Sequence, residues 1–202
     1  NRFYTFAEDI SLSAATALKE HTGELPGVTV EELPVRIYSH DYFASHIIGT
    51  VGKIYAEEYE ALEKKGYAPN DTVGKDGIEK VCEDVLRGTD GYRYAIQDIT
   101  GNSTETVTSK DKDPQKGNDV ILTLDMNMQL ICEKSLPEII ASLRELNGEE
   151  AASSGAAVFM EIETGEILSS ASYPTYNLET FNKDYDILSK QQKASPYLNR
   201  VI

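Results

Sequence analysis

Ser109 and Lys112 are the residues whose spacing most directly suggests catalysis, because they form a Ser-x-x-Lys pattern. In such a pattern, a lysine one helical turn beyond a serine can take the proton of its hydroxyl and so prepare a nucleophile. The serine must then open a helix, whereas these residues enter a polar connector that contains Pro114 and Gly117. We therefore expect no catalytic role for Ser109.

A cluster of charged residues before and within a predicted helix is the second candidate for chemistry. Its members are Lys75, Asp76, Glu79, Glu83 and Asp84. Carboxylates so close together could act as an acid and a base, but a helix cap and a solvated helix face explain the pattern equally well, and we favour that interpretation. The GTVGKI segment (residues 49–54) lacks the spacing with which backbone amides wrap a phosphate, so it predicts a turn beside a strand.

Metal and thiol chemistry find little support in the sequence. His21, His40 and His46 are scattered and show no ligand-pair spacing, so we expect no metal and no cofactor. Cys82 and Cys132 lie in helix-like stretches outside any Cys-x-x-Cys pattern. We interpret both cysteines as small buried apolar residues, and the sequence leaves open whether they pair.

The composition indicates a folded chain with an acidic surface. The 202 residues include 34 Asp and Glu against 19 Lys and Arg, which gives a formal net charge of −15. Such a surface repels phosphate backbones and argues against a nucleic-acid partner. No apolar run approaches the roughly 20 residues that span a bilayer. The length allows one or two domains with a real core.

Helices and interrupted strands are predicted over the first 65 residues. The predicted helices span 9–21, 41–48 and 56–65, and the predicted strands span 28–32 and 35–38. Asp9 is placed to cap the first helix. Pro34 interrupts the two strands, which favours a sheet edge or a bulge.

The segment VGKDGIEKVCEDVLRGTDGY (residues 73–92) carries the clearest helix signal. Asp76 followed by Glu79 fits a capping box, apolar residues then recur at helical spacing, and Gly88 is a stop. We predict one helix of about three turns here.

A hairpin and a connector are predicted next. Residues 92–99 and 104–109 alternate around Thr100-Gly101-Asn102, which is typical of two paired strands. Residues 111–118 (DKDPQKGN) are polar and contain both Pro and Gly, so we place a domain boundary there.

The last third of the chain predicts one long helix and a second hairpin. A strand over 119–124 precedes a helix over 125–147, in which Asp125 is the cap and Pro137 predicts a kink or a break. The second hairpin pairs 156–162 with 166–172 around Glu163-Thr164-Gly165. Because the strands cluster into hairpins, we expect a mixed α+β fold with largely antiparallel strands and several helices.

Five segments, taken together and in their order along the chain, match the motifs of a known family. They are LPGVTVEELPVRIYSHDYFASHIIGTVGKI (25–54), VGKDGIEKVCEDVLRGTDGY (73–92), GNDVILTLDMNMQ (117–129), GAAVFMEIETGEILSSASYPTYN (155–177) and LNRVI (198–202). In this order they resemble a class B penicillin-binding protein. Any one segment alone would be weak evidence for the resemblance, but the five together cover nearly the whole chain.

The residues that match the family's motifs are expected to be structural rather than catalytic. They are Arg36, Gly49, Gly52, Gly74, Gly77, Glu79, Lys80, Glu83, Leu86, Arg87, Gly88, Thr164, Gly165, Asn199 and Arg200. Cys82 stands where the family usually has an aromatic residue, and Glu161 where it usually has Asp. We interpret both departures as variation in packing or on the surface.

The resemblance implies an elongated pedestal, or dimerisation, domain over residues 1–115 and a truncated transpeptidase domain over residues 116–202. The Ser-x-x-Lys serine of the family is expected shortly after Ile202, so this portion is expected to be inactive. The parent protein would cross-link peptidoglycan stem peptides through that serine and bind penicillin at the same place. Apolar faces of the 125–147 helix and the 156–172 hairpin would then lack their cover, so we expect an exposed patch or self-association.

The resemblance also implies partners and a location. The pedestal would act as a spacer that docks membrane proteins of the division or elongation machinery, and a homodimer is left open. The parent would lie on the extracytoplasmic face of the bacterial membrane, held by a single N-terminal anchor that is absent here. The alternatives are a β-lactam sensor or an inactive homologue on the same fold, and a hydrolase with an acidic pair, which the cap and surface roles of the carboxylates disfavour.

Overall fold

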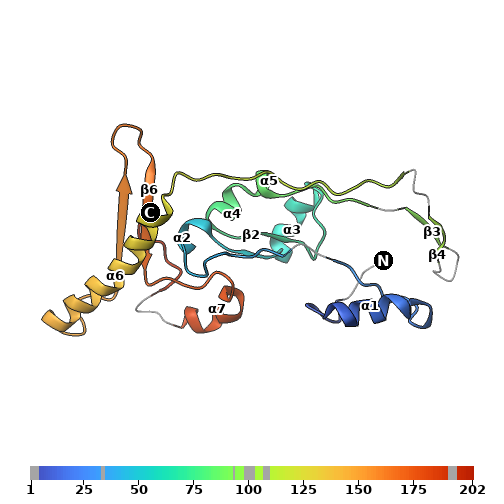
Figure 1. Ribbon diagram of the computed structural model, residues 1–202, viewed down its shortest axis with the longest axis horizontal. Helices are drawn as coiled ribbons and strands as arrows, with labels where there is room; N and C mark the ends of the chain where they lie inside the picture. Colours follow the sequence, from blue (N-terminus) through green and yellow to red (C-terminus); the bar gives the residue numbers. More distant parts are fainter. Residues whose placement is uncertain (1–4, 33–34, 93, 98–102, 107–109, 191–194) are drawn as a thin grey trace. The chain divides into compact units, whose positions relative to one another are not determined.

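The computed structural model describes residues 5–32, 35–92, 94–97, 103–106, 110–190 and 195–202. The chain divides into two compact units, and its course through them is coloured in Figure 1. The smaller unit comprises Asn1–Val35 and Thr89–Gln115, and the larger unit comprises Arg36–Gly88 and Lys116–Ile202. Helices and two-stranded antiparallel sheets make up the described residues, which confirms the predicted α+β class.

Helix α1 (Leu12–Glu20) is the first element assigned in the described part of the smaller unit. It starts after Ser11, whose hydroxyl accepts a hydrogen bond from the backbone N–H of Ala14 at 3.3 Å. The prediction that Asp9 caps this helix is wrong, because Asp9 lies before the cap with a φ of 54°. A single 3-10 turn, η1 (Thr22–Glu24), follows the helix.

A short hairpin also belongs to the smaller unit. Strands β3 (Ala95–Gln97) and β4 (Ser103–Thr106) pair antiparallel, which confirms the predicted hairpin, although its turn lies outside the described residues. The strands predicted over 28–32 and 35–38 are wrong, since no strand is assigned to either segment. Alternation of apolar residues makes a strand only where a neighbouring strand supplies hydrogen bonds, and no described strand pairs with these segments.

The first half of the larger unit is built on a short two-stranded sheet. Its elements are α2 (Ser45–Ile48), β1 (Val51–Lys53), α3 (Ala56–Glu63), β2 (Thr72–Gly74), α4 (Gly77–Val81) and α5 (Glu83–Leu86). β1 and β2 pair antiparallel, and α4 packs on both β2 and α2 (Figure 1). The helices predicted over 41–48 and 56–65 are confirmed, with α2 much shorter than expected.

The single helix predicted within residues 73–92 is two short helices. α4 ends at Cys82, where φ is −99° and ψ is 13°, and α5 begins at the next residue. The predicted capping box is also wrong, because the side chain of Asp76 makes no capping hydrogen bond. Its carboxylate and that of Glu79 bind residues outside the helix instead.

Helix α6 (Met126–Asn147) is the longest element of the larger unit. It starts as predicted, with the carboxylate of Asp125 accepting a hydrogen bond from the backbone N–H of Met128 at 2.8 Å. The helix is continuous through Pro137, so the predicted break does not occur. Gly148 ends it, just after the predicted last residue, Asn147.

The second hairpin packs against α6. Strands β5 (Gly155–Met160) and β6 (Ile167–Tyr173) pair antiparallel as predicted, and helix α7 (Phe181–Ser189) follows them. The strand predicted over 119–124 is wrong. This segment runs to the start of α6 without a ladder, and the N–H of Asp125 donates to the carbonyl of Leu168 at 2.8 Å.

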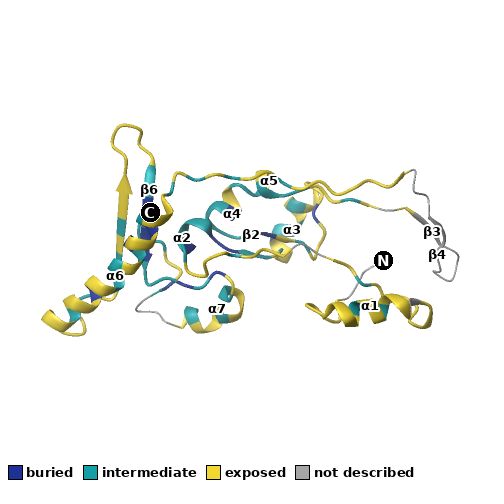
Figure 2. Ribbon diagram, in the orientation of Figure 1, coloured by how far each residue is buried: buried dark blue, intermediate teal, exposed yellow. Residues whose placement is uncertain are grey.

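The core of the larger unit lies where α2 and α6 pack against β6 and the segment that follows it. The buried apolar residues there are Ala44, Cys132, Ile140, Ala171, Tyr176 and Leu178. Much of α6 and β5 is exposed, as the yellow ribbon in Figure 2 shows. Several of the exposed side chains are apolar, among them Ile131, Leu146 and Phe159. Of the helices described here, none is long and apolar enough to cross a membrane.

Candidate functional site

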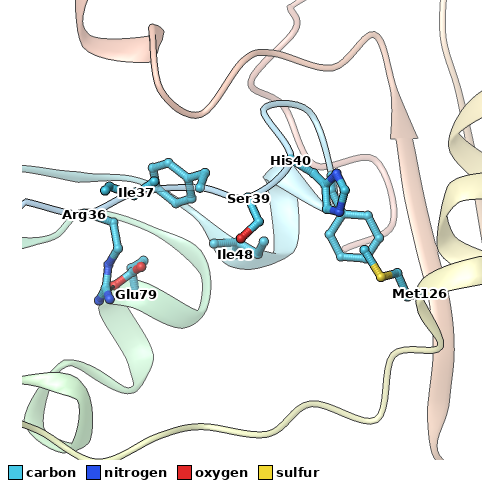
Figure 3. A pocket seen from close by; sticks show the side chains of 9 residues that line it. Arg36, Ile37, Ser39, His40, Ile48, Glu79 and Met126 are labelled. Atoms are coloured by element: carbon cyan, nitrogen blue, oxygen red, sulfur yellow. Dashed lines mark hydrogen bonds and ion pairs between the residues drawn. The ribbon is translucent and has the colours of Figure 1, made fainter.

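Arg36 and Glu79 form the most buried ion pair among the described residues that match the family motifs. The guanidinium Nη2 donates to Oε2 of Glu79 at 2.7 Å, and Glu79 is only 6% exposed. Figure 3 shows the two side chains meeting at one end of a pocket. Burying a carboxylate is costly unless it is paired, so Arg36 holds α4 to the segment that precedes α2.

Asp76 ties the same helix to the chain just after α2. Its Oδ1 accepts hydrogen bonds from the backbone N–H of Thr50 at 2.5 Å and from the Thr50 hydroxyl at 2.9 Å. Thr50 is 3% exposed, so its polar groups need this partner. The carboxylates of the expected capping box thus serve long-range contacts.

Two glycines allow α2 and α4 to approach this closely. Gly49 and Gly77 both have positive φ, at 81° and 56°. A Cβ on Gly77 would stand 2.5 Å from the carbonyl oxygen of Ile47 and 2.7 Å from the N–H nitrogen of Gly49. A Cβ on Gly74 would overlap the backbone of Glu79. Gly49 and Gly77 thus require glycine for both space and backbone conformation, and Gly74 requires it for space.

Glu83 fixes the β2 strand to α5. Its two oxygens accept hydrogen bonds from the hydroxyl of Tyr67 and from the backbone N–H of Gly74, each at 2.8 Å. Burial, together with this bond to a carboxylate, raises the pKa of Tyr67 to about 12. The guanidinium of Arg87 lies over the Tyr67 ring, with Cζ 3.4 Å from the ring centroid.

Arg87 also closes the loop after α3. Its guanidinium donates to the carbonyls of Lys65 at 3.2 Å and Gly66 at 3.1 Å. The backbone of Leu86 lies so close to Gly117 that a Cβ there would overlap it. We call this set the signature cluster: Arg36, Gly49, Gly52, Gly74, Gly77, Glu79, Glu83, Leu86, Arg87 and the partners named above.

The remaining motif residues lie elsewhere or on the surface. Lys80 is exposed and Gly88 is half-buried just beyond α5. Thr164 and Gly165 form the exposed turn between β5 and β6, where the N–H of Gly165 donates to Glu161 at 2.9 Å. The structure therefore separates the hairpin-turn motif from the signature cluster.

A second network joins the residues around α2 to α6, and we call it the junction. Oε1 of Glu133 accepts hydrogen bonds from the backbone N–H of Ala44 and from Nε2 of Gln129, each at 2.7 Å. Gln129 is fully buried and exchanges two hydrogen bonds with the backbone of Ser170 on β6, at 2.8 and 2.9 Å. Burial raises the pKa of Glu133.

Ser45 and His46 extend the junction to the chain after β6. The Ser45 hydroxyl lies 2.6 Å from that of Thr175, and the Tyr176 hydroxyl donates to the Ser45 carbonyl at 3.0 Å. Nε2 of His46 lies 2.6 Å from the carbonyl oxygen of Pro196. Burial lowers the pKa of His46 and raises that of Tyr176.

Asn199 and Arg200 shape the turn at the end of the junction. The guanidinium of Arg200 donates to the carbonyls of Ser195 at 3.2 Å and Leu198 at 3.0 Å, while its backbone N–H donates to the Ser172 hydroxyl at 3.2 Å. Oδ1 of Asn199 accepts from the N–H two residues later at 3.0 Å. This turn is thus attached to β6.

Residues 1–122 match the family model described as the penicillin-binding protein dimerisation domain. The chain belongs to this family. It is similar to peptidoglycan D,D-transpeptidase MrdA of Acinetobacter baumannii, with 34% identity over 184 residues that cover 89% of the chain and 25% of that relative. The chain thus spans about a quarter of the length of this curated relative.

Two solved structures of penicillin-binding proteins are also similar to it. Penicillin-binding protein 2B of Streptococcus pneumoniae superposes with a TM-score of 0.64 and 26% identity, over 82% of this chain and 28% of that one. Penicillin-binding protein 2 of Helicobacter pylori, solved in complex with MreC, gives a TM-score of 0.65 and 27% identity, over 95% and 33%. These likenesses confirm the resemblance to class B penicillin-binding proteins.

A pocket of about 330 Å³ opens beside the Arg36–Glu79 pair. It lies between the segment before α2 and the start of α6. Figure 3 shows Ile37, Ile48 and Met126 lining it. The hydroxyl of Tyr38, another lining residue, is buried without a hydrogen-bond partner. Burial raises the pKa of Tyr38 to about 12, so this hydroxyl stays protonated at neutral pH.

The residues weighed for metal and thiol chemistry lie apart in the described part of the chain. No three His, Cys, Asp or Glu side chains there are grouped as metal ligands. Cys82 and Cys132 are both free, and Cys132 is buried as expected while Cys82 is half-buried. Ser109 lies outside the described residues, and Lys112 forms a backbone bridge with Tyr92.

The junction was not predicted from the sequence. Gln129 and Glu133 stand four residues apart, so their side chains lie on the same side of α6. This spacing was the one available signal. Nothing in the spacing of His46 indicated a partner 150 residues later in the chain.

Proposed function

We propose that this chain is the non-catalytic N-terminal portion of a bacterial peptidoglycan D,D-transpeptidase. Residues 1–115 are the pedestal, and residues 116–202 open the transpeptidase domain. The family match over residues 1–122 and the similarity to MrdA support this assignment. The motif residues, from Arg36 to Arg200, then serve to hold the structure rather than to react.

The parent protein performs acyl transfer through a serine expected beyond Ile202. The hydroxyl attacks the carbonyl of a D-alanyl-D-alanine stem peptide, the terminal alanine leaves, and an amine of a neighbouring stem takes the acyl group. A β-lactam acylates the same serine. Within these 202 residues, Ser109 and Lys112 form the sole Ser-x-x-Lys pattern, and Glu163-Thr164-Gly165 has Glu where the family's Lys-Thr-Gly motif has Lys.

The junction is the observation that carries the scaffold role. Side chains and backbone from residues 44–46 bind Glu133 of α6, Thr175 after β6 and Pro196 near the end of the chain. Several of these groups are buried, so the contacts cannot be exchanged for water without cost. Such a network suits a base that holds the start of a catalytic domain in one orientation.

The proposed role includes protein partners and a location outside the cytoplasm. The chain is a spacer on the extracytoplasmic face of the membrane that docks membrane proteins of the elongation or division machinery. The complex of the H. pylori relative with MreC supports a docking role. The net charge of −15 supports the absence of a nucleic-acid partner.

Covalent labelling by a fluorescent penicillin tests the proposal. The label is incubated with this 202-residue chain and with the same chain extended through its natural C-terminus, and the covalent mass is read for each. We expect label on the extended protein alone. Label on the 202-residue chain would overturn the proposal, because it would place a nucleophile among these residues.

The same experiment decides between the transpeptidase and its alternative. An extended protein that takes no label would favour an inactive homologue on the same fold. A β-lactam sensor would take the label but would release no terminal alanine from a stem-peptide substrate, so alanine release is measured alongside.

A further inference from the structure

The turn formed by Ser195–Arg200 is held from two sides. On one side the Ser172 hydroxyl of β6 donates to the carbonyl of Leu198 and accepts from the N–H of Arg200, both at 3.2 Å. On the other side His46 of α2 reaches the carbonyl of Pro196 at 2.6 Å. The first anchor belongs to the proposed transpeptidase part, whereas the second comes from the proposed pedestal.

The hydrogen on His46 can be placed from its neighbours. A carbonyl oxygen can only accept, so Nε2 carries the hydrogen that points to Pro196. Nδ1 lies 3.5 Å from the hydroxyl of Ser45, which is in turn 2.6 Å from the hydroxyl of Thr175. A neutral imidazole fits this chain, with Nδ1 free to accept from Ser45, and burial favours the neutral form.

Packing restricts the imidazole as well as its hydrogen bond. Its ring meets that of Tyr176 edge to face, with 5.0 Å between the centroids, and the hydroxyl of Tyr176 binds the carbonyl of Ser45. Pro196 itself is buried, so its carbonyl has little access to water in place of the imidazole. The contact is therefore directional and shielded, which is what positioning a backbone segment requires.

We propose that His46 is a positioning residue for the acyl-transfer reaction, because its hydrogen bond to the Pro196 carbonyl fixes the Ser195–Arg200 turn that leads to the nucleophilic serine. This inference rests on the proposed function, which expects that serine shortly after Ile202. His46 touches neither substrate nor reacting atoms. A residue of the pedestal thereby sets the geometry of a segment that runs toward the reaction centre.

The extended protein allows a direct kinetic test. The acylation rate constant with fluorescent penicillin is compared for the unaltered protein and for His46→Ala and His46→Gln, with His21→Ala as the matched control. His21 is an exposed histidine of the smaller unit. We expect acylation to fall roughly 10- to 100-fold in His46→Ala, the usual consequence of misplacing a reacting group by about 1 Å.

The glutamine variant separates positioning from mere structural support. Its side-chain amide retains a donor for the Pro196 carbonyl, so we expect it to recover most of the acylation rate, while the thermal midpoint of both His46 variants is recorded. The loss should fall on the acylation step and leave initial penicillin binding within about twofold of the unaltered protein. The proposal is overturned if His46→Ala acylates at the unaltered rate, or if both variants lose rate in proportion to lost stability.

Amide hydrogen exchange keeps the test independent of the proposed activity. Protection at residues 197–201 is measured in the same proteins, and we expect it to fall at least tenfold in His46→Ala but not in His46→Gln or His21→Ala. If the unaltered protein takes no penicillin, the proposed function fails, and the exchange data still decide the contact. Unchanged protection in His46→Ala would show that the imidazole does not hold the turn.

Discussion

The β1–β2 pair, which lies within the signature cluster, and the β5–β6 hairpin are two antiparallel strand pairs of the same compact unit. They differ in how far neighbouring elements cover them. In the cluster, β1 and β2 lie among helices, and an ion pair with a 6% exposed carboxylate, Arg36–Glu79, is enclosed between elements. In the hairpin, α6 covers part of the sheet, while Val158, Phe159 and Met160 on β5 are 45–54% exposed. The first strand pair is thus enclosed by neighbouring elements, whereas one strand of the second pair, β5, stays largely exposed.

Glycines make this contrast measurable. Gly77 in the cluster and Gly165 in the hairpin turn both have positive φ, at 56° and 76°. A Cβ on Gly77 would meet the backbone of Ile47 and Gly49, whereas nothing lies within 4 Å of the position of a Cβ on Gly165. The two residues therefore share a conformational requirement and differ only in their neighbours.

Gly77→Ala is expected to lose the most stability of the glycine variants. The positive φ costs about 1–2 kcal/mol for any L-residue, and the clash with two backbone segments adds about 1–3 kcal/mol, because backbone cannot move aside as a side chain can. Gly165→Ala should lose only the first amount. The free energies of unfolding of both variants, from urea denaturation, give the comparison.

Equal losses in the two glycine variants would contradict the close approach of α2 and α4. Gly66→Ala serves as a further control, since Gly66 has a φ of 86° and open space where a Cβ would stand. It should match Gly165→Ala.

Features that depend only on neighbouring residues in the chain could be predicted from the sequence. Asp125 before an apolar run and Thr164-Gly165 between two alternating runs need no distant partner, so the α6 cap and the β5–β6 turn were predicted correctly. Asp76 and Glu79 failed for the opposite reason. Acids three residues apart at a helix start suit a capping box, but here each satisfies a buried group from a segment that sequence spacing cannot bring near.

The junction shows the same difference between local and long-range contacts within one helix. Asp125 and Gln129 both belong to the first turns of α6, yet the first binds its own helix and the second binds β6. The sequence can predict that a polar residue on the inner side of a helix is buried, but it does not predict which group that residue contacts. The partners Ala44 and Pro196 were therefore beyond reach, and the domain boundary near 115 stays a prediction.

Glu133→Ala should give a loss of similar size to that of Gly77→Ala, and Glu133→Gln almost none. Removal of the carboxylate leaves the N–H of Ala44 and the amide of Gln129 without their shared acceptor, at about 1–3 kcal/mol for each buried donor. Glutamine keeps an acceptor oxygen in the same place. Unfolding free energies of the two variants at neutral pH test this, and an equal loss in both would show that the negative charge itself is required.

The pH dependence of stability should follow from Glu133 with a definite sign. Burial raises its pKa in the folded state above the ordinary value of 4.5, so the folded chain binds the proton more tightly than the unfolded chain. Its contribution to stability is then complete below the unfolded pKa and is lost as pH rises through the folded pKa. The free-energy difference between Glu133→Gln and the unaltered chain should therefore favour the variant increasingly as the pH rises from the unfolded pKa of Glu133 through its raised folded pKa. A difference that shrinks over this range would contradict the burial of the charge.

A substitution on the exposed face of α6 and β5 should have the smallest effect on stability but a clear effect on self-association. Ile131 is 64% exposed and Ile140 is 5% exposed, so the same residue type on one helix serves both the open and the closed side. Ile131→Lys should change the free energy of unfolding by no more than about 0.5 kcal/mol, whereas Ile140→Ala should lose about 2–5 kcal/mol. Apolar patches of this kind drive contact between copies, so the unaltered 202-residue chain should self-associate in sedimentation velocity and Ile131→Lys should do so less. If the unaltered chain sediments as a monomer over the whole concentration range, exposure on this face does not create an attractive surface, and the contrast with the signature cluster is one of packing alone.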